Sequence, residues 1–81
     1  MKKILVTGGL GFIGSHTVVE LQNKGFEVVI IDDLSNSKID VLEKITEITG
    51  IKPPFHKIDL RVKADVTSFF DTNKVDGVIH F

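Results

Sequence analysis

The chain has 81 residues, no cysteine and a formal net charge of −1. This length is near the lower limit for a self-sufficient hydrophobic core, so we expect the chain to be part of a longer protein. The composition excludes disulfides, thiolate metal sites and cysteine nucleophiles from these residues, and the charge gives no reason to expect nucleic acid or a membrane as partner. No apolar stretch is long enough to span a bilayer and no signal cleavage site is visible, so we expect a cytoplasmic protein.

Strand and helix patterns alternate along the chain without a repeat or a linker. Short runs rich in apolar and β-branched residues predict strands at 3–7, 27–32, 55–59 and 76–81. Apolar residues at helical spacing predict helices at 12–24, from about 41 to Gly50, and at 62–70, with Gly25 as the cap of the first. The helical side chains expected to face the core are Ile13, Thr17, Val18, Leu21, Val41, Leu42, Ile45, Ile48, Val66, Phe69 and Phe70.

The connections between successive strands are too long for hairpins, which predicts parallel strands joined by right-handed crossovers. The expected fold class is α/β, with the order βαβαβαβ of the first half of a doubly wound parallel sheet, a Rossmann fold. In that arrangement the first strand is central, the second and third lie to one side, and the fourth lies to the other. A ligand crevice is then expected at the carboxyl ends of the first and fourth strands, where the residues that follow all four strands converge.

A glycine-rich segment, Thr-Gly-Gly-Leu-Gly-Phe-Ile-Gly over 7–14, joins the first strand to the first helix. It spaces Gly8, Gly11 and Gly14 as needed for a tight turn, a close approach of backbone to a pyrophosphate, and close packing of helix on strand. The helix N-terminus adds unpaired N–H groups for an anion. A glycine turn without a ligand is the alternative, but the flanking strand and helix, and Asp32 at the end of the next strand, favour a dinucleotide site.

Asp32 ends the second predicted strand, where a carboxylate can accept hydrogen bonds from the two hydroxyls of an adenosine ribose. A 2′-phosphate at that place would meet like charge, and no Lys or Arg follows before Lys38, so we expect NAD rather than NADP. Asn36 and Ser37 follow in the turn, and their side chains could equally cap the second helix.

Asp59 ends the third predicted strand, beside the expected adenine pocket. Its carboxylate could accept a hydrogen bond from the adenine amino group, while the Leu60 N–H could donate to a ring nitrogen. His16, His56 and His80 show no metal-ligand spacing, so we interpret them as structural and expect no metal site.

Four stretches of the sequence carry a family resemblance. They are Met-Lys-Lys-Ile-Leu-Val-Thr-Gly-Gly-Leu-Gly-Phe-Ile-Gly-Ser-His-Thr over 1–17, Asp-Asp-Leu-Ser-Asn-Ser over 32–37, Asp-Leu-Arg over 59–61 and Val-Ile-His-Phe over 78–81. Together they resemble the amino-terminal segment of the UDP-glucose 4-epimerases, a family of extended short-chain dehydrogenases/reductases. The glycine motif is shared by the whole superfamily, whereas Gly-Ser-His-Thr and the turn at 32–37 are more particular to the epimerases. Asp33 is a departure, because many members have Asn there.

This resemblance implies a set of NAD contacts beyond the three glycines. They are the backbone of Phe12 and Ile13 at the pyrophosphate, Asp32, Asp33, Leu34, Ser35, Asn36 and Ser37 around the adenosine ribose, Asp59 and Leu60 at the adenine, and Phe81 on the nicotinamide side.

The resemblance also implies an activity, in which bound NAD takes a hydride from C4 of a UDP-sugar and returns it to the opposite face of a 4-keto intermediate. That reaction interconverts UDP-glucose and UDP-galactose in galactose metabolism, and homodimers are expected. The family's base is a Tyr in a Tyr-x-x-x-Lys motif, and this chain has no tyrosine. We therefore expect no catalytic residue in it. Residues 1–81 would be a partial NAD-binding domain, inactive alone, without the rest of the Rossmann domain or the sugar-binding domain.

Two alternatives remain from the sequence. Another NAD-dependent extended family member acting on a nucleotide sugar, a dehydratase or a decarboxylase, would share nearly every feature above. A nonenzymatic nucleotide-binding or interaction module is less favoured, because a chain that ends on a buried type of strand leaves that strand uncovered.

Overall fold

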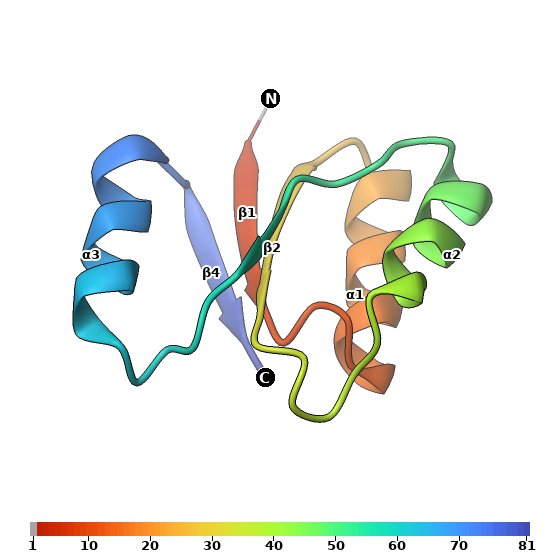
Figure 1. The fold of residues 1–81 in the computed structure, drawn as a ribbon. Coiled ribbons are helices and arrows are strands. Elements are labelled where there is room, and N and C mark those ends of the chain that lie inside the picture. Colours follow the sequence, from red (N-terminus) through yellow and green to blue (C-terminus); the bar gives the residue numbers. More distant parts are fainter. Residues whose placement is uncertain (1) are drawn as a thin grey trace.

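The computed structural model describes residues 2–81, which form a parallel sheet with helices on both faces (Figure 1). Met1, the first residue of the family resemblance, lies outside the described residues. In chain order the elements are β1 Lys3–Thr7, α1 Phe12–Asn23, β2 Glu27–Asp32, α2 Asp40–Thr49, β3 Phe55–Lys57, α3 Lys63–Thr72 and β4 Gly77–His80. All strand pairs are parallel and the strand order is β3-β2-β1-β4. The predicted α/β class and the place of every strand in the sheet are confirmed.

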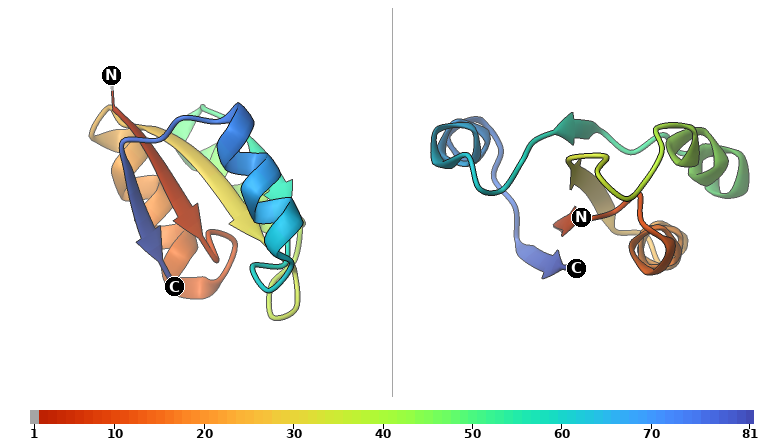
Figure 2. Two further views of the ribbon diagram at one scale, coloured as in Figure 1. Left: turned by 90° about the vertical axis from the view of Figure 1, so that its left-hand side faces the viewer. Right: turned by 60° about the horizontal axis from the view of Figure 1, so that its bottom comes forward.

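The sheet has a core on each face, which explains why the middle residues of its central strands β1 and β2 are all apolar. Helices α1 and α2 cover one face and α3 lies on the other (Figure 1, Figure 2). On the α1 and α2 side the buried cluster consists of Val6, Leu10, Val18, Val28, Ile30, Leu42 and Ile45, and on the α3 side of Leu5, Val29, Ile31 and Phe69. Alternate residues of β1 and β2 thus face opposite cores, as expected for a sheet covered on both sides.

Three side chains predicted to face the core are exposed instead. They are Ile13 at 64%, Ile48 at 67% and Phe70 at 44%. In α1 the buried row is Gly14, Val18 and Gln22, one position away from Ile13. The close approach of Gly14 to the glycine loop sets the rotation of this helix, because a Cβ on Gly14 would lie 2.1 Å from the Gly8 carbonyl oxygen.

The outer strands are shorter than predicted, for a reason of pairing. β3 ends at Lys57 rather than at residue 59, because Lys57 pairs with Asp32, the last residue of β2, and no residue of β2 follows to pair with Ile58 or Asp59. β4 spans 77–80 rather than 76–81, and its His80 pairs with Thr7, the last residue of β1. Gly25, at φ 89°, follows α1 as predicted. Within residues 2–81, no helix has both the length and the apolar character needed to cross a membrane.

Candidate functional site

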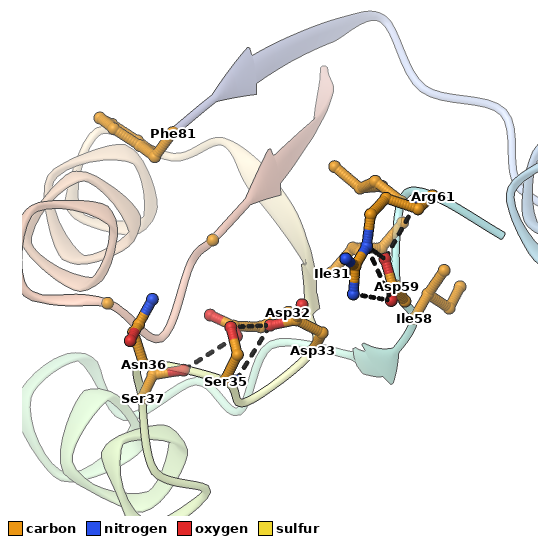
Figure 3. A pocket seen from close by; sticks show the side chains of 13 residues that line it. Ile31, Asp32, Asp33, Ser35, Asn36, Ser37, Ile58, Asp59, Arg61 and Phe81 are labelled. Carbon is orange, nitrogen blue, oxygen red and sulfur yellow. Dashed lines mark hydrogen bonds and ion pairs between the residues drawn. The ribbon is translucent and has the colours of Figure 1, made fainter.

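A pocket of about 450 Å³ opens at the carboxyl ends of the strands (Figure 3). Its lining comes from the glycine loop after β1, the end of β2 with the loop that follows it, the segment after β3, and the residue after β4. The lining residues are Gly8, Gly11, Ile31, Asp32, Asp33, Ser35, Asn36, Ser37, Ile58, Asp59, Leu60, Arg61 and Phe81. The crevice predicted from strand order is therefore present.

The glycine loop at the base of the pocket is a compact turn. Gly8 has a φ of 70°, and its N–H donates to the Ile31 carbonyl at 2.7 Å, while the Gly11 N–H donates to the Gly8 carbonyl at 3.1 Å. The first turn of α1 has neither a side-chain cap nor an acidic residue. Its leading N–H groups therefore remain available for an anion, which the partial positive charge of the helix end also favours.

Asp32 connects the glycine loop to the loop after β2. Its side chain is buried, with Oδ2 accepting the Leu10 N–H at 3.1 Å and Oδ1 accepting both the Leu34 N–H and the Ser37 hydroxyl at 2.8 Å. A carboxylate offers about four acceptor positions, so Oδ2 keeps one open. The expected contact with two ribose hydroxyls then requires the Ser37 hydroxyl to turn away and free Oδ1.

The loop after β2 is shaped by side chains that accept backbone hydrogen bonds. Leu34 adopts a φ of 64°, a rare conformation for a branched residue, and the bond from its N–H to Asp32 stabilises it. The N–H and hydroxyl of Ser35 both donate to Asp33 and hold the pKa of that carboxyl below its usual value. The helix cap considered for Asn36 and Ser37 is not formed, since α2 begins after Ile39 without a side-chain cap.

Asp59 and Arg61 form an ion pair on the opposite wall of the pocket (Figure 3). The Arg61 Nη2 group donates to Asp59 Oδ2 at 2.8 Å, and the Arg61 backbone N–H donates to Oδ1 at 2.9 Å. These bonds lower the pKa of Asp59 and raise that of Arg61. Asp59 is consequently an ionised, acceptor-only group at neutral pH.

The pocket brings most of the predicted cofactor contacts together. Those that line it are Gly8, Gly11, Asp32, Asp33, Ser35, Asn36, Ser37, Asp59, Leu60 and Phe81. Four do not line it. The side chains of Phe12 and Ile13 lie on the outer surface of α1, Gly14 is packed against the glycine loop, and Leu34 contacts the core on the α1 and α2 side.

Three lining residues were not predicted from the sequence. Ile31 and Ile58 directly precede Asp32 and Asp59 in the sequence, and they add apolar side chains to the lining. Arg61 belongs to the Asp-Leu-Arg stretch of the resemblance, and its spacing of two from Asp59 was the available signal.

The three histidines make contacts that account for them structurally. His16 packs edge-on against Phe12 with ring centroids 5.0 Å apart, and His56 packs in the same way against Phe69 at 5.1 Å. His80 Nδ1 is hydrogen-bonded to the Thr7 hydroxyl at 2.6 Å, which ties β4 to β1 beside the glycine loop.

Comparison with known proteins assigns the family. The sequence model of the NAD dependent epimerase/dehydratase family matches residues 4–81. The chain belongs to this family. Similar sequences include the UDP-glucose 4-epimerase of Neisseria meningitidis serogroup B, 53% identical over the whole chain, and that of Bacillus subtilis, 51% identical over 96% of it. The chain spans only 24% and 23% of the lengths of these two relatives.

Solved structures of epimerases share the fold of the chain. The UDP-glucose 4-epimerase of Stenotrophomonas maltophila, with bound NAD and formylated UDP-arabinopyranose, matches all of it with a TM-score of 0.94 and 44% identity. The enzyme of Bifidobacterium longum, in complex with NAD+ and UDP, matches 98% of it with a TM-score of 0.93 and 43% identity. In both cases the chain covers 24% of the solved protein.

Proposed function

We propose that these residues form the NAD-binding part of an enzyme that interconverts UDP-glucose and UDP-galactose through a 4-keto intermediate. The observation that carries this proposal is sequence identity of 53% and 51% to two UDP-glucose 4-epimerases, over 100% and 96% of the chain. Residues 1–81 are then the first part of a Rossmann domain, whose remainder and sugar-binding domain come from segments outside this chain.

The donor set of the pocket fits a dinucleotide. The glycine loop leaves no room for a Cβ at Gly14, and the N-terminus of α1 that follows offers N–H groups to a pyrophosphate. On either side of that anion site, Asp32 retains an acceptor position for a ribose hydroxyl, and Asp59 with the Leu60 N–H can pair with an adenine edge. Bound NAD would supply the hydride chemistry, while these residues would bind and orient it.

The charge of the pocket supports NAD rather than NADP. Asp32 and Asp33 are adjacent at the ribose side, and a 2′-phosphate there would be repelled. The single cation in the lining, Arg61, is already paired with Asp59.

The test uses protein expressed from its complete reading frame. We expect NAD to bind, and we expect UDP-galactose to be converted to UDP-glucose without net consumption of NAD. Conversion of other UDP-sugars to dehydrated or decarboxylated products instead would replace the proposed activity by that of another member of the family. Failure to bind NAD would overturn the assignment of the pocket.

We further propose that the protein acts in the cytoplasm, without nucleic-acid or membrane partners, because its proposed ligands are soluble nucleotides. We propose a homodimer on the family resemblance alone. Cell fractionation and light scattering of the purified protein test both statements.

A further inference from the structure

We propose that Arg61 is a positioning residue, which holds the Asp59 carboxylate in the orientation that selects adenine over a purine with an oxygen at position 6. This inference rests on the proposed binding of NAD. It concerns the base of the dinucleotide, whereas the glycine loop and Asp32 address its pyrophosphate and ribose.

The geometry of the pair fixes the carboxylate at both oxygens. The Arg61 backbone N–H donates to Asp59 Oδ1 at 2.9 Å, and the guanidinium donates from Nη2 to Oδ2 at 2.8 Å. Nε lies between the two oxygens, at 3.1 Å and 3.2 Å. Because one residue contacts both oxygens from two directions, rotation of the Asp59 side chain would break at least one of these bonds.

The Asp59 carboxylate is accessible to a ligand although Arg61 contacts both of its oxygens. Three N–H groups of Arg61 make four contacts with it, because Nε is shared between Oδ1 and Oδ2. The Asp59 side chain is 32% exposed and lines the pocket. The pair thus presents an ionised acceptor, in one orientation, at the wall expected to meet the base.

A purely stabilising role explains the pair less well. The Arg61 side chain is 87% exposed, and among residues 2–81 its hydrogen bonds go to Asp59 alone. Exposed ion pairs of this kind contribute little to folding stability. Because the pair lies on the wall of the pocket, we expect it to act on ligand binding.

The chemistry of purines turns this orientation into selectivity. Adenine carries an amino group at position 6, which donates to the ionised carboxylate, whereas hypoxanthine carries a carbonyl oxygen that would face it acceptor to acceptor. The ring nitrogen at position 1 accepts a hydrogen bond in adenine but carries a proton in hypoxanthine. The Leu60 N–H can therefore pair with adenine and not with hypoxanthine, which also favours adenine. A carboxylate freed from Arg61 could rotate away from the mismatched oxygen, and the selectivity would fall.

The test compares NAD with nicotinamide hypoxanthine dinucleotide, using protein expressed from its complete reading frame and freed of cofactor. We expect the unmodified protein to prefer NAD. Arg61→Gln should reduce the ratio of the dissociation constant of the hypoxanthine dinucleotide to that of NAD by about fivefold or more, mainly by improving binding of the hypoxanthine dinucleotide. Lys63→Gln is the matched control, since it removes an exposed cation two residues further along without touching Asp59, and it should leave the ratio unchanged.

A double-mutant cycle separates this inference from the proposed function. Asp59→Asn supplies an amide that can donate as well as accept, so it should remove the preference, and adding Arg61→Gln to it should have no further effect. If Arg61→Gln leaves the ratio unchanged, or weakens both dinucleotides equally, the positioning role is wrong while NAD binding stands. If the unmodified protein binds neither dinucleotide, the proposed function fails together with this inference. Melting temperatures of all variants verify that they are folded.

Discussion

At the scale of single residues, the carboxylates of the pocket have different tasks. Asp32 is buried and braces two loops through Leu10, Leu34 and Ser37, so its position depends on the folded backbone around it. Asp59 lies on the opposite wall and depends on one partner, Arg61. Substitution of Asp32 should therefore disturb both folding and binding, whereas substitution at the Asp59 pair should act on the ligand.

Replacement of Asp32 by Ala should weaken NAD binding by about 1 to 3 kcal/mol, the range for a buried hydrogen-bonded group that loses its partner. It should also lower the melting temperature, because the Leu10 and Leu34 N–H groups lose their acceptor. Calorimetric titration with NAD and NADP measures the first effect. The control is Asp33→Asn, which retains an acceptor for Ser35 and should cost less. Equal or tighter binding of NADP by the unmodified protein would contradict the role given to Asp32.

Replacement of Arg61 by Gln should raise the pKa of Asp59 toward its ordinary value of 3.8, since the guanidinium is the main cause of its lowering. A carboxyl whose pKa is lower in the folded state stabilises the fold above its unfolded pKa, and that contribution is lost as the pH falls through the folded pKa. A carboxyl-detected NMR titration of the unmodified protein and of Arg61→Gln measures the pKa of Asp59 in each. An unchanged Asp59 titration would show that the ion pair does not persist in solution.

At the scale of elements, α1 contacts the glycine loop at Gly14 so closely that no side chain fits there. An added Cβ at Gly14 would lie 2.1 Å from the Gly8 carbonyl oxygen and 3.1 Å from the Cα of Gly9, which are backbone atoms that cannot turn aside as a side chain can. The same contact places the N-terminus of α1 beside the pocket.

Gly14→Ala should therefore destabilise the protein by about 1 to 3 kcal/mol or more, the usual cost of overpacking, and weaken NAD binding by displacing the loop. Thermal unfolding and NAD titration measure the two effects. Gly77→Ala is the matched control, because its Cβ would meet only the end of the Ile4 side chain, at 3.3 Å. Equal effects of the two substitutions would show that the approach of helix and loop is not a strict requirement.

At the scale of the whole molecule, β4 is an edge strand of the 81-residue chain. Val78 in this strand is 52% exposed and Phe81 just beyond it is 50% exposed, beside backbone groups that no neighbouring strand pairs within residues 2–81. Such an edge favours association with another strand.

The 81-residue chain by itself should therefore self-associate or be only partly folded. Light scattering over a concentration series, with hydrogen exchange on the same samples, measures both properties. A stable monomer at low concentration with strongly protected amides at 78–81 would show that the four-stranded sheet is self-sufficient.

The same chain should show no epimerase activity at any concentration of NAD. Proton abstraction from a sugar hydroxyl needs a positioned base, the chain has no tyrosine, and its histidines are engaged in the contacts described above. Incubation with NAD and UDP-galactose, followed by analysis for UDP-glucose, measures this. Turnover by a sample proven free of longer protein by mass spectrometry would contradict it.

The sequence by itself determined the order of the elements, the parallel sheet and the segments that meet at the carboxyl ends of its strands. Apolar periodicity and glycine spacing are local properties of the chain, and the connections between strands allowed one arrangement of the sheet. For that reason the sequence alone predicts Asp32 and Asp59 at the crevice, and the pocket contains both.

Only the tertiary structure decided the rotation of each helix about its axis and how the carboxylates use their acceptor positions. Ile13 is exposed because contact between Gly14 and the glycine loop sets the rotation of α1, a distance between segments that periodicity does not encode. Likewise, the bonds of Asp32 to Leu10 and Ser37 depend on how two loops approach each other in space. Such contacts arise from packing distances of a few ångströms, and no pattern along the chain specifies them.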